Sequence, residues 1–315
     1  MKFNPNKWGI IYNPMAGSGE GKGRWHEIQE YLDSCDIKYD YFQSEGYGAV
    51  ERLADILMNN GYKTLIIVGG DGALNELING ILLSKPVQND PNYLEQIRFG
   101  IIPNGLANDF AKFWDLSTDY KTAIQGLLSG RTRKVDIGQT RHYNTTKGQH
   151  IYRYFINAVN IGVGERMVRV TDRAKRFWGW KYMALLEAGF MLLFEKKQHK
   201  MHLRIDDVHI KGRYMTVCIG NCTGWGQTPS AVPYNSWLDI SLIHRPKGIG
   251  HFIYCLWQMI NNRIQNLKEV DVFRGKDIRV MRARNASIDL DSRLLGRCYP
   301  LDIKILPEKI TMMIP

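Results

Sequence analysis

The sequence predicts an α/β domain with a doubly wound, mainly parallel sheet, followed by a second domain that folds as a β-sandwich. Three observations support this prediction. β-Branched runs alternate with helical patterns over about the first 130 residues, Gly-rich turns follow the early strands, and short alternating strand patterns fill the remainder. A chain of 315 residues has room for two domains of roughly 150 residues each. We expect the first domain to cover residues 1–133 and the second 134–305, while a final strand within 306–315 could return to the first.

The first domain is predicted to consist of repeated β–turn–α units. Strands are expected at residues 8–12, 38–43, 64–68 and 98–102, with helices at 25–33, 49–59, 74–83 and 120–129. Such units produce a mainly parallel sheet with helices on both faces. Ligands of these sheets bind at the carboxyl ends of the strands, which is where the Gly-rich turns fall here.

The second domain is predicted from short alternating segments that are typical of antiparallel strands. They lie at residues 135–138, 151–159, 201–205, 214–219, 238–243, 269–272, 278–281, 286–290 and 301–305, with helices expected near 172–195 and 249–264.

Charge and cysteine usage limit the class of protein. The net charge of +11 suits nucleic acid, an anionic membrane surface, or solubility alone. The five cysteines show no CxxC pair and no zinc-like spacing with histidine, and the polar first residues do not resemble a signal peptide, so we expect a reducing cytoplasm. The longest apolar stretch, 182–194, is shorter than the roughly 20 residues of a spanning helix. We therefore expect no integral membrane protein.

The most informative motif is the stretch 69–80, GGDGALNELING, which directly follows the apolar run 64–68. Glycine lets the backbone turn sharply and approach a ligand closely, and the first N–H groups of the helix that follows attract phosphate. The Asp71 carboxylate can hold Mg²⁺ at this junction, although it would repel bare phosphate. The motif predicts a nucleotide site used in phosphoryl transfer.

Two further turns follow predicted strands. Residues 13–22, NPMAGSGEGK, lack the spacing of a Walker loop and could be an ordinary connector. Residues 102–112, IPNGLANDFAK, place Asp109 in the first turn of a helix, where an Asn/Asp pair could serve only as an N-cap. Because all three turns stand at successive strand ends, together they indicate one ligand site.

NPMAGSG, GGDGALNELING and IPNGLANDFAK, in this order, resemble the diacylglycerol kinase catalytic-domain family, in particular its soluble bacterial lipid kinases. The segments 135–138, 155–162 and 301–307 also resemble that family, so the resemblance covers nearly the whole chain. NAD kinases share GGDG but lack the NDFA turn and rank second. The resemblance implies ATP and Mg²⁺ bound between an α/β domain and a β-sandwich.

The resemblance also implies the residues of the site. The nucleotide would be lined by Asn13, Pro14, Met15, Ala16, Gly17, Ser44, Gly70, Asp71, Gly72, Ala73, Leu74, Asn75, Glu76 and Leu106, and the metal-bound phosphates would face Asp71 and Asp109.

Several positions depart from the family pattern. The family takes the proton of the substrate hydroxyl with a base from a D-G-E turn, and here that turn keeps Asp291 but has Arg293 in place of glutamate. Arginine accepts no proton near neutral pH, so Asp291 is the expected base, with Asp289 on the same strand face as the alternative, and Arg293 could clamp the γ-phosphate. Two family threonines are Ala73 and Leu106, and Asn235-Ser236 replaces an Asp-Gly pair of a structural Mg²⁺ site.

The resemblance implies an ATP-dependent kinase that transfers the γ-phosphate to a lipid hydroxyl. A family member that binds nucleotide or lipid without phosphorylating it is the first alternative, and a soluble small-metabolite or NAD kinase is the second. The segment 166–183 interleaves basic residues with Phe, Trp and Tyr. This pattern fits peripheral contact with an anionic membrane and a helix that packs its aromatic side chains inward equally well. No RNP, KH or helix-turn-helix pattern supports binding to nucleic acid.

Overall fold

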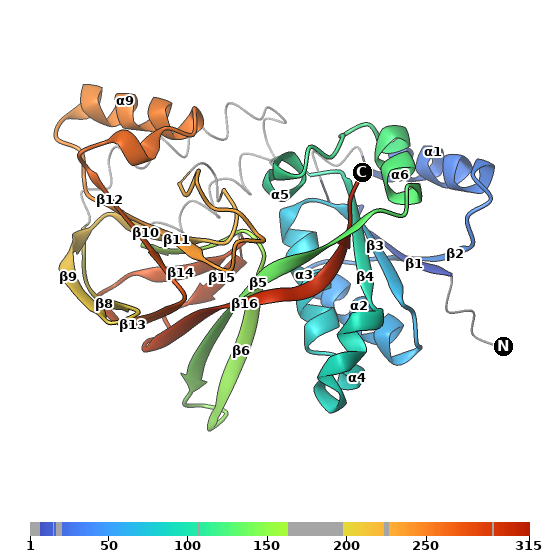
Figure 1. The fold of residues 1–315 in the computed structure, drawn as a ribbon, viewed down its shortest axis with the longest axis horizontal. Helices are drawn as coiled ribbons and strands as arrows, with labels where there is room; N and C mark the ends of the chain where they lie inside the picture. Colours follow the sequence, from blue (N-terminus) through green and yellow to red (C-terminus); the bar gives the residue numbers. More distant parts are fainter. Residues whose placement is uncertain are drawn as a thin grey trace. The chain divides into compact units, whose positions relative to one another are not determined.

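The computed structural model describes residues 7–14, 16, 21–105, 108–162, 198–223, 227–291 and 293–315. Its contacts divide the chain into two compact units, 1–135 with 308–315, and 136–307 (Figure 1). The first unit is an α/β fold and the second is rich in antiparallel strands, which confirms the predicted fold class. The assignment of nucleotide to the first unit and lipid to the second stays a prediction.

The first unit is built on a sheet whose pairs are all parallel, in the order β2-β1-β3-β4-β16. Its strands are β1 (Trp8–Tyr12), β2 (Tyr39–Gln43), β3 (Thr64–Gly69), β4 (Arg98–Pro103) and the end of β16 (Leu301–Met313). Its helices are α1 (Gly21–Ser34), α2 (Ala49–Asn59), α3 (Asp71–Leu82), α4 (Lys85–Asn89), the 3-10 turn η1 (Pro91–Gln96), α5 (Asp109–Phe113) and α6 (Tyr120–Leu128).

Helices cover both faces of this sheet (Figure 1). On one face, α1 and α6 pack Trp25, Ile28 and Ile124 against the strands. On the other, α2 approaches β1 so closely that a Cβ on Gly9 would lie 3.0 Å from a methyl carbon of Leu57. All six residues of β3 are buried, as expected for a central strand with helices above and below it.

The described part of the second unit contains the strands and one helix that follow. They are β5 (Thr132–Asn144), β6 (Gln149–Phe155), β7 (Ala158–Gly162), β8 (His199–Ile205), β9 (Val208–Tyr214), β10 (Thr216–Gly220), β11 (Leu238–Ile243), α9 (Ile249–Ile260), the 3-10 turn η3 (Ile264–Asn266), β12 (Val270–Gly275), β13 (Asp277–Ala283), β14 (Ser287–Leu290), β15 (Arg293–Gly296) and the start of β16.

Two sheets form this unit. One has the order β16-β13-β8-β9, with the pair β5-β6 joined to β16, and the other has the order β12-β11-β10-β7-β14-β15. The strands β7, β10 and β11 of the second sheet and β8, β13 and β16 of the first contribute to one buried apolar cluster. A shared core between two antiparallel sheets is a sandwich, as predicted.

The structure divides one predicted strand, joins the predicted strand 301–305 and the predicted final strand into the single strand β16, and adds two. The predicted strand 151–159 is two strands, β6 and β7, because the N–H groups of Ile156, Asn157 and Ala158 donate to the Asp291 carboxylate. The strands β9 and β15 were not predicted: β9 carries several polar, exposed positions, and β15 is only four residues long. The predicted helix at 172–195 lies outside the described residues. Among the helices that are described, none is long and apolar enough to cross a membrane.

Candidate active site

The second and third Gly-rich turns of the first unit meet backbone to backbone. The N–H of Asn104 donates to the carbonyl of Gly69 at 2.9 Å, which holds the ends of β3 and β4 together. A Cβ on Gly70 would lie 2.8 Å from the Cα of Gly105, and one on Gly105 would lie 2.5 Å from the Cα of Gly70. Neither approach is possible with a side chain, so the two glycines allow the two turns to pack as one unit.

The carboxylate of Asp71 joins the same two turns. Its Oδ2 accepts the N–H of Asp109 at 3.0 Å and its Oδ1 accepts the N–H of Phe110 at 3.1 Å, so it caps the start of α5. Asn108 adopts a left-handed φ of 50° and closes the third turn, with its amide bonded to both backbone groups of Gly105 at 2.9 and 2.8 Å. The structure therefore places the carboxylate of Asp71 against the backbone of Asp109, the other predicted metal ligand.

These two carboxylates suit a magnesium ion. Carboxylate oxygens are the ligands that Mg²⁺ prefers, and a carboxylate offers about four acceptor positions. The Asp109 side chain is largely buried, 16% exposed, with the Lys112 ammonium 3.9 Å away. In their chemistry, the two side chains are therefore donors of the kind that the implied ion takes.

The turn also offers space and a hydrogen-bond donor. Among the described residues, no atom lies within 4 Å of the Cβ position of Gly72, in the first turn of α3. Asn104, which is buried, accepts a bond from Arg24 through Oδ1 at 3.1 Å, while its Nδ2 has no partner among the described residues. Since a buried donor without a partner is costly, this amide is suited to bind a ligand oxygen.

Arg24 was not predicted as a site residue. Its guanidinium links α1, just after the first Gly-rich turn, to Asn104 and to the carbonyl of Thr118 at 3.1 Å. Only its place after GSGEGK in the sequence could have indicated this role.

The first turn is described in part. The N–H of Asn13 donates to the carbonyl of Val68 at 3.0 Å, and the N–H of Ala16 donates to the carbonyl of Asn13 at 3.1 Å. Pro14 is buried. The first turn is thus tied to β3, next to GGDG. The predicted site residues Met15, Gly17 and Leu106 lie outside the described residues.

The Glu76 carboxylate contacts the start of α2. One oxygen accepts the N–H of Gly48 at 2.7 Å, and the other accepts those of Val50 at 2.8 Å and Glu51 at 3.3 Å. These are the amides that a helix leaves without partners at its N-terminus, and a buried negative charge there is favoured by the helix dipole. The contacts are those of a cap provided by one helix, α3, to another.

The other predicted nucleotide residues of this region are mostly enclosed. Ser44, Leu74 and Asn75 are buried, and Ala73 is 7% exposed. A Cβ on Gly69 would lie 2.8 Å from the Cβ of Ala73. The small side chain at position 73 therefore packs against the end of β3.

In the second unit, Asp291 holds a turn of the backbone. It has a left-handed φ of 47° after β14 and is 5% exposed. Its Oδ2 accepts the N–H of Ile156 at 2.7 Å, and its Oδ1 accepts those of Asn157 at 2.9 Å and Ala158 at 2.8 Å. Three of roughly four acceptor positions of the carboxylate are thus used by backbone amides. The predicted base is also an anchor between β14 and the β6–β7 connection.

Arg293 and Asp289 flank this turn on neighbouring strands. Arg293 begins β15 and pairs with Leu290, so Asp291 lies in the connection of a tight hairpin. Asp289 pairs with Leu294 across the hairpin and is 3% exposed. The structure therefore brings the three predicted catalytic positions into one hairpin.

The replacement of Asp-Gly by Asn235-Ser236 falls on a tight turn beside β5. Ser236 adopts a left-handed φ of 63°, a conformation that favours glycine. Its N–H donates to the buried carboxylate of Asp136 at 2.6 Å, and Asn235 accepts the N–H of Trp237 at 2.9 Å. The turn keeps a glycine-like conformation although the glycine is absent. Sequence reasoning did not identify Asp136, whose partner is a hundred residues away.

The predicted membrane segment 166–183 lies outside the described residues.

Comparison with known proteins matches the first unit to a family. Residues 7–140 match the model of the diacylglycerol kinase catalytic domain. The diacylglycerol kinase of Staphylococcus saprophyticus is 30% identical over 215 residues, which cover 67% of this chain and 63% of that protein. The match thus spans less than two thirds of the length of this relative.

Solved structures show the same fold. A diacylglycerol kinase from Bacillus anthracis has a TM-score of 0.68 at 17% identity, covering 100% of this chain and 98% of that one. A yeast NADH kinase, solved with NADH, has a TM-score of 0.54 at 9% identity, covering 99% and 84%. The family match coincides with the three Gly-rich turns, so residues 7–140 of this chain are similar to the diacylglycerol kinase catalytic domain.

Proposed function

We propose that the chain is an ATP-dependent lipid kinase that transfers the γ-phosphate of ATP to a lipid hydroxyl. The observation that carries the proposal is the joint unit of the second and third turns, in which Gly70 and Gly105 are in contact and Asp71 caps α5. The open space at Gly72 and the Nδ2 donor of Asn104 support a phosphate-bearing ligand there. The match of residues 7–140 to the kinase family supports the reaction class.

In the proposed reaction, the oxygen of the lipid hydroxyl bonds to the γ-phosphorus while the bond from that phosphorus to ADP breaks. Mg²⁺, when bound, would offset the charge of the phosphates. Asp71 and Asp109 would hold it, and the amides at the start of α3 would orient the nucleotide. The proton of the hydroxyl must pass to a base, and Asp291, whose carboxylate also accepts three backbone amides, is the expected residue.

The test of function is a titration of ATP with Mg²⁺ into the purified protein, followed by transfer of label from γ-labelled ATP to a mixed lipid extract. We expect both binding and transfer. Asp71→Asn should weaken binding in the presence of Mg²⁺, while denaturant unfolding checks that the variant is folded. If label is transferred to a water-soluble acceptor, and added liposomes do not change the rate of transfer, the substrate is a small metabolite and not a lipid.

A second candidate function follows from the hairpin at 289–293. Arg293 stands where the family has a glutamate, and the Asp291 carboxylate is engaged by three amides. These observations favour a family member that binds nucleotide or lipid without phosphorylating it. Binding of ATP without transfer of label to any lipid would establish this function in place of the first.

Asp291→Asn separates the two roles of this residue. Loss of charge-assisted bonds to three amides should reduce the free energy of unfolding by about 1.5–3 kcal/mol. If Asp291 is the base, transfer of label at saturating substrate should also fall by about 10²–10⁴-fold in folded protein. A variant that is less stable but transfers label at the wild-type rate would leave Asp291 as an anchor only.

We also propose that residues 166–183 contact an anionic membrane, on the sequence evidence of interleaved basic and aromatic residues. Co-sedimentation with anionic liposomes at low salt tests this contact, and failure of the wild-type protein to sediment would remove it.

A further inference from the structure

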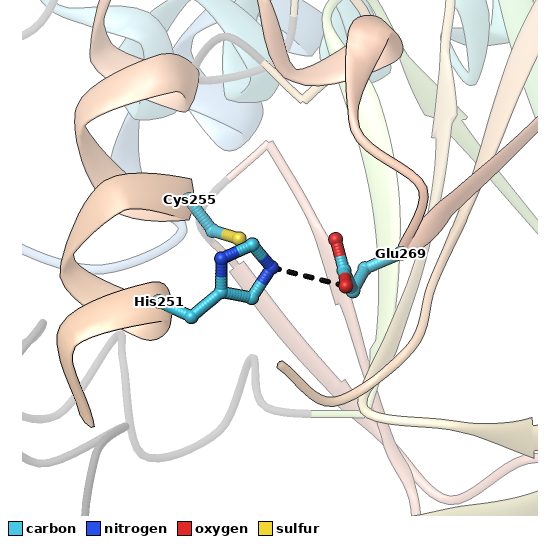
Figure 2. A group of neighbouring side chains, drawn as sticks. All are labelled: His251, Cys255 and Glu269. Carbon is cyan, nitrogen blue, oxygen red and sulfur yellow. Dashed lines mark ion pairs between the residues drawn. The ribbon is translucent and has the colours of Figure 1, made fainter. Parts of the chain in front are cut away.

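A histidine, a cysteine and a glutamate meet at one end of the second unit, apart from the kinase motifs. His251 and Cys255 lie four residues apart on α9, so they share one face of the helix. Glu269 comes from the segment just before β12 and faces them, as Figure 2 shows. The Nε2 of His251 lies 3.0 Å from the Oε1 of Glu269, and the imidazole nitrogen, the thiol sulfur and a carboxylate oxygen all lie within 4.8 Å of one another.

We propose that these three side chains bind one zinc ion. Nitrogen, sulfur and oxygen together form a donor set that suits Zn²⁺, whereas Mg²⁺ prefers oxygen alone. Zinc ligands lie about 2.0–2.3 Å from the ion, so tetrahedral ligands are roughly 3.3–3.8 Å apart. The present spacing reaches this geometry with movements of about 1 Å or less. The fourth position is left for water.

The surroundings give the ion a structural role. Cys255, Leu256 and Met259 of α9 rest against a small apolar cluster that includes Ile264, Leu267 and Val270. This cluster is separate from the main core of the sandwich. A metal held by α9 on one side and Glu269 on the other would fix the helix to the start of β12, and its binding free energy would add to the stability of the folded protein.

A pair of histidines elsewhere in the second unit makes the thiol the diagnostic ligand. His202 and His209 face each other on β8 and β9 with ring nitrogens 3.4 Å apart, and they too could collect a metal. That pair has no sulfur. Absorption from thiolate to a bound cobalt ion therefore reports on the site at His251 and not on the pair.

The test adds Co²⁺, and then Zn²⁺, to the metal-free full chain. We expect a thiolate-to-cobalt absorption band that saturates at one ion per chain and is abolished when Zn²⁺ displaces cobalt. Cys255→Ser should remove the band, and His251→Gln, at a side chain that is 39% exposed, should weaken binding while the fold is retained. Cys35→Ser, at a partly exposed thiol in the other unit, is the matched control and should keep the band.

The unfolding temperature provides a second readout. Zn²⁺ should raise it in the wild type and in Cys35→Ser, and raise it less in His251→Gln. The proposal is wrong if the wild type gives no thiolate band, or if the band persists in Cys255→Ser. Neither measurement uses ATP or lipid, so the result does not depend on kinase activity.

Discussion

Two acidic residues of the GGDG segment, Asp71 and Glu76, have different surroundings five positions apart. The Asp71 carboxylate lies between the second and third turns. The buried Glu76 carboxylate accepts three amides at the start of α2. The family resemblance alone assigns both residues to the nucleotide, whereas the contacts of Glu76 are those of a helix cap.

Replacing Glu76 with glutamine tests this distinction. The new NH₂ group would face amide donors, so we expect the free energy of unfolding to fall by about 2–3 kcal/mol. Urea unfolding measures the loss, and Glu45→Gln, at an exposed position of the same region, is the control and should be neutral. If the variant is as stable as the wild type but does not bind ATP, Glu76 is a residue of the nucleotide site and not a helix cap.

The two kinds of glycine in this site predict opposite results for the same substitution. Gly105→Ala places a Cβ 2.5 Å from the Cα of Gly70 and should cost about 1–3 kcal/mol of stability. Gly72→Ala meets no described atom within 4 Å and should gain up to about 1 kcal/mol. If the space at Gly72 belongs to the nucleotide, the same variant should weaken ATP binding by about tenfold or more. Thermal unfolding and calorimetry of both variants check these outcomes.

At the scale of elements, periodicity in the sequence predicts the strands that have a clear pattern of burial. The runs at 64–68 and 98–102 correspond to β3 and β4 because both are buried on two faces. The break between β6 and β7 could not be predicted, since it depends on a carboxylate about 130 residues later in the chain. The Gly70–Gly105 contact could not be predicted for a similar reason, because the need for glycine at each position arises only from its contact with the other.

β5 carries a buried histidine that links stability to pH. Burial lowers the pKa of His142 from its usual 6.5, and the charges of Arg153 and His150 lower it further. The folded state thus binds this proton more weakly than the unfolded state, so stability is retained above pH 6.5 and declines as the pH falls below it. We expect denaturant midpoints to fall on acidification, and to fall less in His142→Gln. An equal decline in both proteins would assign the effect to other groups.

At the scale of the whole molecule, the net charge of +11 favours binding to anionic surfaces. Raising the ionic strength from 0.01 to 0.15 M shortens the screening length from about 30 to about 8 Å. Binding to anionic vesicles should therefore weaken steeply over this range, and vesicles of neutral lipid should bind little at either salt. Sedimentation that ignores both salt and lipid charge would show that the attraction is not electrostatic.

The path of β16 has a consequence for the order in which the protein can be made. Its residues 311–312 lie parallel to β4 and complete the sheet of the first unit, yet they follow the entire second unit in the chain. During synthesis on the ribosome, the edge of the apolar strand β4 that pairs with β16 therefore stays unpaired until residue 312 has been translated. Such an edge recruits strands from other chains, so a fragment ending at residue 135 is a poor choice for expressing the nucleotide site alone.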